Sequence, residues 1–272
     1  GRERGAHAVR GAHAVRGALS VDLLQSLGAD WIKRQGLAPL VWHSLAAQDP
    51  AARHSPAAAA LREAYYGGVV NAELQRRAWG RALDALAARG IVPVVFKGLA
   101  LAYTAYPDPA CRPMGDLDLW VAADEMPGAQ AALEQLGYAR YDRADRPLAL
   151  QRLLHNELLL LGPRAAGPIE LHWSPFGGTW LSLTAAVDVA AIRARAAPLL
   201  WPGGRVMALA PEDSVIQLAV HWGISHQLSS PWLRALVDVA LLAGAQPVDW
   251  LAVAQRARAW RVATVTWLVL SL

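Results

Sequence analysis

The sequence predicts an α+β protein, and three observations support that class. Apolar residues recur at helical spacing before residue 90 and again after about residue 176, whereas strand-like alternation is concentrated between 91 and 175. The clearest strand lies at 115–121, where polar and apolar residues alternate. Because 54% of the 272 residues are apolar and 18% are charged, the chain can bury a sizeable core.

This distribution divides the chain into four regions. Residues 1–17, which contain Arg-Gly-Ala-His-Ala-Val twice, are expected to form a disordered leader. Residues 18–90 are predicted to form an N-terminal helical region. Residues 91–175 form the strand-bearing core, and residues 176–272 form a C-terminal helical region.

The N-terminal region is expected to contain short helices over 20–45, a linker over 49–56 and one long helix. Ser55 is the predicted N-cap of the long helix, because a serine hydroxyl can accept a hydrogen bond from a free backbone N–H in the first turn. The helix is predicted to run from Pro56 to residue 89 and to stop at Gly90. The Gly67-Gly68 pair is expected to bend or break it.

A buried strand is predicted at 91–96, directly before a helix over 99–106. Pro93 lacks a backbone donor, so the strand should have a free edge or an irregularity at that position. Gly98 allows the chain to turn, which directs the helix N–H groups and Lys97 toward one place. Such a junction favours the binding of an anion.

The strand at 115–121 carries two carboxylates on one face. Side chains of a strand alternate between faces, so Asp116, Asp118 and Trp120 share one side and the intervening apolar residues share the other. Carboxylates at this spacing can converge on a divalent cation such as Mg²⁺ or Mn²⁺. Two like charges this close are unfavourable unless a positive group lies between them, and a metal or an arginine would serve.

The elements after this strand are predicted from the same patterns. Glu170 lies on the polar face of the second hairpin strand, and His172 lies on that face two residues further on. The expected elements are a helix at 124–136, a short strand at 138–142, a hairpin of 156–161 with 168–173, helices after Gly178, a helix opened by Pro211, a helix at 232–244 and a core helix at 262–272.

Charge and composition narrow the function only slightly. The net charge of +4 is scattered, which suits an anionic substrate and does not mark a nucleic-acid binder. Only two of the 26 basic residues are lysines, Lys33 and Lys97. The single cysteine, Cys111, excludes an internal disulfide and favours a reducing, cytoplasmic location. Neither a signal peptide nor a membrane-spanning segment is expected.

With these residues identified, the chain resembles the uncharacterised nucleotidyltransferases of the DNA polymerase β superfamily. The resemblance rests on Lys97-Gly98, on the Arg-x-x-x-Asp-x-Asp-Leu segment at 112–119 and on Glu-Leu-His-Trp at 170–173. It extends more weakly over 30–272. It implies a small mixed β-sheet, forming a nucleotidyltransferase core, flanked by N-terminal and C-terminal helices.

The resemblance also implies roles for individual residues. Asp116, Asp118 and Glu170 would be the catalytic carboxylates that hold Mg²⁺ or Mn²⁺. Lys97, Gly98 and Arg112 would bind the nucleotide, although Arg112 could instead orient the aspartates by a bidentate pair. His172 would contact substrate or serve as a hydrogen-bonded structural residue. The superfamily's usual turn has glycine or serine after the first glycine, whereas Leu99 follows Gly98 here.

The function expected from the sequence is therefore transfer of a nucleoside monophosphate from an NTP to a hydroxyl acceptor, on a small molecule, a peptide or an RNA end. Two alternatives remain open at this point. One is transfer of another group, such as a sugar or phosphate, in natural-product tailoring on the same fold. The other is a non-catalytic binding module that has kept the fold.

Overall fold

The computed structural model describes residues 26–48, 54–141, 155–163, 167–229 and 231–272. The expected leader at 1–17, the start of the first predicted helix and most of the predicted linker lie outside the described residues. The helices are α3 (Ala29–Arg34), α4 (Ala38–Gln48), α5 (Pro56–Ala87), α6 (Lys97–Thr104), α7 (Met126–Glu134), α9 (Thr179–Thr184), α10 (Val189–Arg195), α11 (Pro211–Val220), α12 (Trp232–Ala245), α13 (Trp250–Ala259) and α14 (Ala263–Leu270), with the 3₁₀ helix η2 (Pro109–Cys111) and the π-helix η3 (His221–Ser225). The strands are β1 (Val94–Val95), β2 (Leu117–Trp120), β3 (Ala139–Arg140), β4 (Glu157–Leu161), β5 (Ile169–His172), β6 (Ala197–Leu199) and β7 (Val206–Ala208).

The chain divides into two compact units. The first contains the described residues up to 73, together with 101–113 and 228–248, and is helical. The second contains residues 74–100, the described part of 114–227, and 249–272, and it holds all seven strands. The predicted α+β class is therefore confirmed, and its sheet belongs to the second unit.

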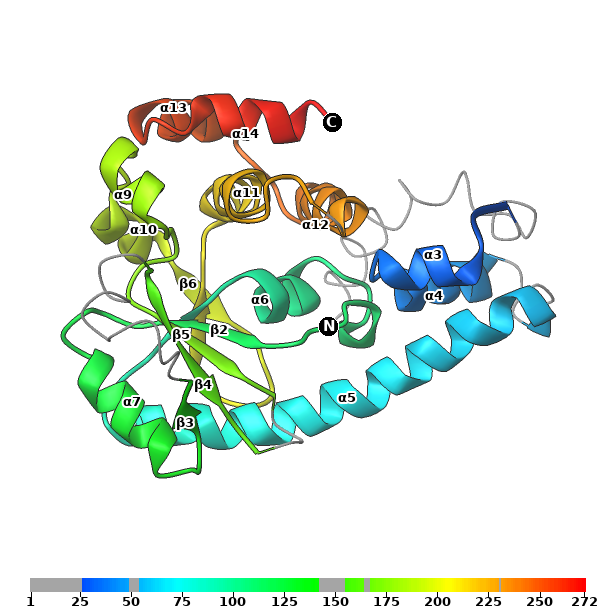
Figure 1. Ribbon diagram of the computed structural model, residues 1–272, viewed down its shortest axis with the longest axis horizontal. Coiled ribbons are helices and arrows are strands. Elements are labelled where there is room, and N and C mark those ends of the chain that lie inside the picture. Colours follow the sequence, from blue (N-terminus) through cyan, green and yellow to red (C-terminus); the bar gives the residue numbers. More distant parts are fainter. Residues whose placement is uncertain (1–25, 49–53, 142–154, 164–166, 230) are drawn as a thin grey trace. The chain divides into compact units, whose positions relative to one another are not determined.

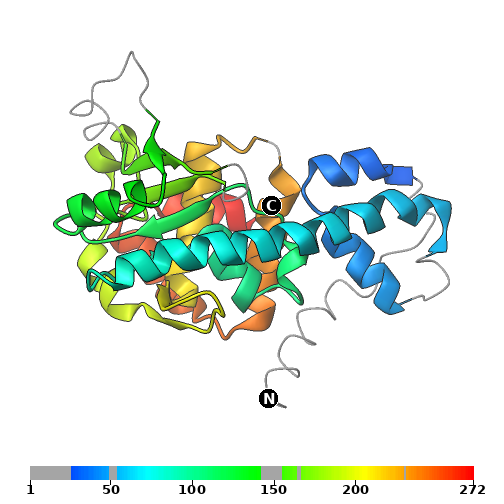
Figure 2. The ribbon, with the colours of Figure 1, turned by 90° about the horizontal axis from the view of Figure 1, so that it is seen from below.

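The seven strands form one mixed sheet in the order β3-β4-β5-β2-β1-β7-β6. β2 pairs in parallel with β5 and antiparallel with β1, which in turn pairs in parallel with β7. Within the second unit, α7 and the C-terminal half of α5 lie on one side of this sheet, and α11 lies toward the other (Figures 1 and 2). β2 is thus a central strand, and all four of its residues are buried.

The long helix α5 begins where the sequence predicted. The Ser55 side chain accepts a hydrogen bond from the backbone N–H of Ala58, and Gly90 follows the helix with φ 75°. The expected break at Gly67-Gly68 was wrong, because α5 continues through both glycines. Gly68 has a packing role instead: a Cβ atom there would lie 2.7 Å from the carbonyl oxygen of Ala110.

Three further predictions need correction. The strand predicted at 91–96 is only the two-residue β1, which begins after Pro93, as an irregularity at the proline would require. The alternative of a free edge is wrong, because β1 pairs on both sides and the Pro93 carbonyl accepts a hydrogen bond from the N–H of Met207. The C-terminal region is not only helical, because β6 and β7 form a hairpin there. The helix predicted at 262–272 exists as α14, but it is not a core helix: Trp267 is 70% exposed.

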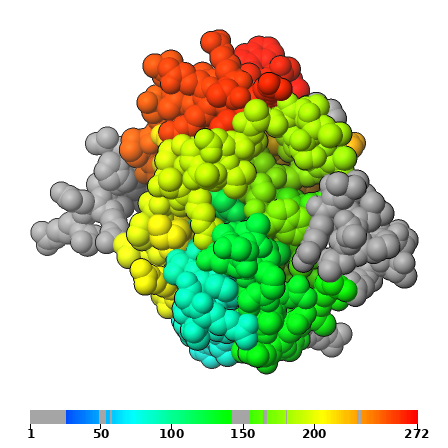
Figure 3. All heavy atoms as spheres, turned by 90° about the vertical axis from the view of Figure 1, so that its left-hand side faces the viewer, coloured from blue at the N-terminus to red at the C-terminus, as the bar shows by residue number. Residues whose placement is uncertain are grey.

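The C-terminal helices cover part of the surface of the second unit. α13 and α14 pack on α11, and in Figure 3 they form the red surface beside the yellow surface of the β6–β7 region. Asp249 caps α13 by accepting hydrogen bonds from the N–H groups of Leu251 and Ala252. Among the described residues, no helix combines the length and apolar character needed to cross a bilayer.

Candidate active site

Asp118 and Glu170 lie side by side on the central strands of the sheet. They are direct partners in the parallel pairing of β2 with β5, so their side chains emerge next to each other on one face. Asp118 is 3% exposed, whereas the Glu170 side chain is 23% exposed. The sequence-based expectation that strand alternation brings these two carboxylates together is thus met.

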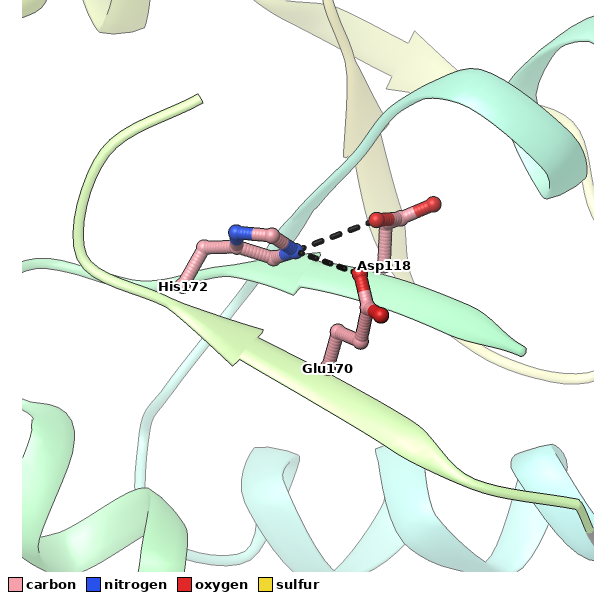
Figure 4. A group of neighbouring side chains, drawn as sticks. All are labelled: Asp118, Glu170 and His172. Carbon is pink, nitrogen blue, oxygen red and sulfur yellow. Dashed lines mark hydrogen bonds and ion pairs between the residues drawn. The ribbon is translucent and has the colours of Figure 1, made fainter. Parts of the chain in front are cut away.

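His172 completes a compact cluster with the two carboxylates. Two residues beyond Glu170 on β5, it points to the same side of the sheet, and its Nε2 lies 3.0 Å from Asp118 Oδ1 and 3.6 Å from Glu170 Oε2 (Figure 4). Its other nitrogen, Nδ1, lies 3.2 Å from Glu157 Oε2 on β4. Being only 1% exposed, His172 is fixed by carboxylates on both sides.

Lys97 supplies the positive charge of the site. Its Nζ donates a hydrogen bond to Asp118 Oδ1 at 2.6 Å and lies 3.7 Å from Glu170 Oε2. The sequence reasoning expected either a metal or an arginine to offset the carboxylates, and the structure places a lysine there. The side chain is only 14% exposed, so Lys97 is not a turn residue in free water.

The backbone at Lys97 is unusual for a residue with a side chain. Its φ is 51°, in the left-handed region that non-glycine residues rarely occupy. Gly98 follows it, buried in the first turn of α6. Strained backbone of this kind costs of order 1–3 kcal/mol and persists where the surroundings enforce it. Here the strain accompanies the placement of the ammonium group between two carboxylates.

Asp116 has a different position from the one expected of a third cluster member. It lies one residue before β2 and is half-buried. The group of metal-ligating side chains found among the described residues consists of Asp118, Glu170 and His172, with their ligand atoms within 4.8 Å of one another. His172 thus stands where the sequence pattern had suggested Asp116.

Arg112 makes its bidentate pair with a residue that the sequence pattern did not connect to it. Its Nε and Nη2 donate to the two oxygens of Asp238, at 3.0 and 2.8 Å. Tyr106 donates to the same carboxylate at 2.6 Å. All three residues are buried in the first unit, whereas the cluster around Asp118 belongs to the second.

The electrostatics of the cluster favour its charged forms. Burial alone would raise the pKa of Asp118, but the Lys97 ammonium and the hydrogen bond from His172 outweigh it and hold that pKa well below the usual range. Burial would lower the pKa of Lys97, yet Asp118 and Glu170 raise it overall. The pKa of His172 is also raised, because its hydrogen bonds to Asp118 and Glu170 exceed the effect of burial.

The donor set fits a divalent cation. Two carboxylate oxygens and one imidazole nitrogen converge, and the more exposed carboxylate, Glu170, gives access from outside. Carboxylate oxygens are the ligands that Mg²⁺ prefers, and imidazole is tolerated by Mn²⁺ and related ions. A cation bound here would take over the charge-balancing position that Lys97 holds.

Sequence reasoning missed Glu157. This residue opens β4 and pairs with His172 in the antiparallel register, and burial is the largest of the effects that raise its pKa. The predicted hairpin contained the necessary signal, because extending its register from the turn would have placed residue 157 opposite residue 172. Lys97 was among the predicted site residues, but its ion pair with Asp118 was not expected. It reaches the cluster from the first residue of α6, directly after β1.

Fold and site together define a chemical class: an α+β protein whose central strands carry paired carboxylates beside a buried lysine. A comparison with family models identifies that class. The chain belongs to the family of uncharacterised nucleotidyltransferases, whose model matches residues 26–272. It is therefore an enzyme of the nucleotidyltransferase type. A comparison with curated proteins finds no matching relative.

Solved structures with a similar arrangement include two of the antibiotic-resistance factor ANT(2'')-Ia. Its solution structure is 15% identical over 68% of this chain and 92% of that one, with a TM-score of 0.45. Its crystal structure with adenylyl-2''-tobramycin is 14% identical over 66% of this chain and 93% of that one, with a TM-score of 0.46.

Proposed function

We propose that this protein transfers a nucleoside monophosphate from an NTP to a hydroxyl acceptor in a reaction that depends on Mg²⁺ or Mn²⁺. One observation carries the proposal within the nucleotidyltransferase family. Asp118 and Glu170 face each other across neighbouring strands, and the buried cation Lys97 contacts both. A site that is built to hold positive charge between carboxylates suits the polyphosphate chemistry of this family.

Asp118 and Glu170 would hold the divalent ion, with Asp116 as a further carboxylate at the entrance of β2. The ion would supply charge neutralisation to the phosphates and orient them for in-line displacement. Lys97, once released from Asp118, is placed to contact the triphosphate as a point charge beside the first turn of α6. His172 keeps its proposed role in substrate binding, and Gly98 allows the backbone to approach the phosphates. Arg112 is left out of the proposed site, because it is buried in the first unit and paired with Asp238 there.

In the proposed reaction, one bond to the α-phosphorus forms, one breaks, and one proton is transferred. The acceptor oxygen bonds to the α-phosphorus, and the bond from that phosphorus to the pyrophosphate oxygen breaks. Glu170, the more exposed carboxylate of the pair, can accept the proton that leaves the acceptor hydroxyl. Pyrophosphate takes away the negative charge released at the leaving oxygen.

A nucleotide screen tests this proposal. The melting temperature of the full chain is measured with each of the four NTPs, in the presence of Mg²⁺ or Mn²⁺ and in its absence. At least one NTP should stabilise the protein in an ion-dependent manner, because a ligand that binds only the native state raises its stability.

The matched controls are Glu170→Gln and Glu134→Gln. Both remove one carboxylate charge, but Glu134 is exposed on α7. The stabilisation should shrink in Glu170→Gln and persist in Glu134→Gln. If no NTP stabilised the wild type with either ion, the proposed transfer from an NTP would be contradicted, and a binding module that has kept the fold would be favoured.

A further inference from the structure

Two histidines outside the carboxylate cluster come together at an irregular helix turn. After α11 the chain enters the π-helix η3, in which the backbone N–H of His226 bonds to the carbonyl of His221. This five-residue step brings the two imidazoles into contact, with Nε2 atoms 3.0 Å apart. π-helical turns are rare and are frequently found at functional sites.

The turn is held in place by close packing. Gly223 lies against α14 so tightly that a Cβ atom there would be 2.3 Å from Val265 Cγ2. The two residues that follow His226, Gln227 and Leu228, both have positive φ values, 49° and 58°. Two successive side-chain-bearing residues in this region represent strain, which persists where the surroundings enforce it.

The orientation of the two rings differs from that of a simple hydrogen bond. If the two nitrogens pointed straight at each other across 3.0 Å, the ring centres would lie roughly 5.3 Å apart, since a hydrogen bond prefers a straight approach. The observed separation of the ring centres is 4.5 Å. Two imidazoles directed at one ion at ~2.0–2.1 Å would have nitrogens ~2.9–3.4 Å apart and ring centres ~4.5–5.2 Å apart, the lower values belonging to an angle of about 90° at the ion. The observed separations fall at the lower end of both ranges.

We propose that His221 and His226 form a second cation site that binds a borderline transition metal such as Zn²⁺, Ni²⁺ or Cu²⁺. Neutral imidazole is a preferred ligand of Zn²⁺, Ni²⁺ and Cu²⁺, whereas Mg²⁺ selects oxygen. The protein would thus offer two sites of different chemistry, oxygen-rich at Asp118 and Glu170 and nitrogen-rich at η3. Water or a substrate group would complete the coordination of the second ion.

Exposure and protonation suit this role. His226 is exposed, so an ion can reach the pair from solvent. Burial, aided by the nearby Lys97 ammonium, holds the pKa of His221 well below its usual range, so this residue is neutral and able to coordinate. The assignment does not depend on the proposed reaction, since it concerns a separate set of ligands.

Co²⁺ absorption and competition by Zn²⁺ test the assignment on the full chain. Wild type should bind Zn²⁺ in the presence of excess Mg²⁺. His226→Ala should weaken Zn²⁺ binding by about tenfold or more, because a two-ligand chelate becomes a single ligand. His226→Cys keeps a zinc ligand and should retain binding. Because residue 226 is exposed, these variants should keep the wild-type circular dichroism spectrum.

Two controls separate this site from other sources of affinity. His54→Ala removes an exposed histidine elsewhere and should bind Zn²⁺ as wild type does. Asp118→Asn weakens any Zn²⁺ binding by the carboxylate cluster itself, so the Zn²⁺ binding that remains in this variant should still depend on His226. The assignment would be overturned if His226→Ala bound Zn²⁺ unchanged, or if Asp118→Asn alone removed the binding.

Discussion

Asp118→Asn is expected to slow nucleotidyl transfer by about a hundredfold to a thousandfold. Asp118 is buried at the centre of the cluster, and its charge is what would hold a divalent ion opposite Glu170. Losing several kcal/mol of charge stabilisation in the transition state converts to a rate effect of about this size. The measurement is pyrophosphate release from the NTP that stabilises the wild type.

The same variant should lose a modest amount of stability even without metal. Isolated aspartates would repel, so removing one would stabilise the strand, but Lys97 and His172 already offset Asp118. The asparagine oxygen can still accept a hydrogen bond from Lys97, and Lys97 keeps its ion pair with Glu170. We therefore expect the free energy of unfolding to fall by only about 1–3 kcal/mol. Asp84→Asn, on the exposed face of α5, is the matched control and should change neither property. Full activity in Asp118→Asn would place the reaction elsewhere.

Lys97→Met should make the protein depend on divalent metal for its stability. Without the ammonium, only His172 remains to offset Asp118 and Glu170, and the expected loss is about 3 kcal/mol in metal-free buffer. Mn²⁺ should restore more stability to this variant than it adds to wild type, because in wild type the ion must displace Lys97. NTP affinity should fall, since the point charge for phosphate is gone.

The comparison uses melting temperatures with and without Mn²⁺. Lys33→Met is a close control because Lys33 is the other lysine of the chain and is exposed. It should respond to Mn²⁺ as wild type does. An identical Mn²⁺ response in Lys97→Met and wild type would mean that the ammonium and the ion do not share a position.

The sequence predicted the parts of this site that depend on local periodicity. Alternation along β2 and β5 is a property of neighbouring residues, so it assigned Asp118, Glu170 and His172 to polar faces. The turn after β1 likewise followed from Gly98. The three-residue strands β6 and β7 escaped notice because alternation cannot be recognised over so few positions.

The parts that were missed depend on contacts between distant segments. Lys97 reaches Asp118 because β1 pairs with β2, and a single sequence does not show which strands pair. The partner of Arg112 is Asp238, 126 residues further along the chain. To predict which carboxylate pairs with Arg112, one must know how the helices pack against each other. Composition and residue spacing do not specify that packing.

The most direct measurement is a crystal structure with Mn²⁺ and a non-hydrolysable analogue of the stabilising NTP, with the ion located by its anomalous scattering. We expect a manganese peak coordinated by the carboxylates of Asp118 and Glu170. Lys97 Nζ should move away from Asp118 toward the phosphates. If the nucleotide bound with its manganese elsewhere, while Lys97 stayed paired with Asp118, the proposal that Asp118 and Glu170 hold the catalytic ion would be contradicted.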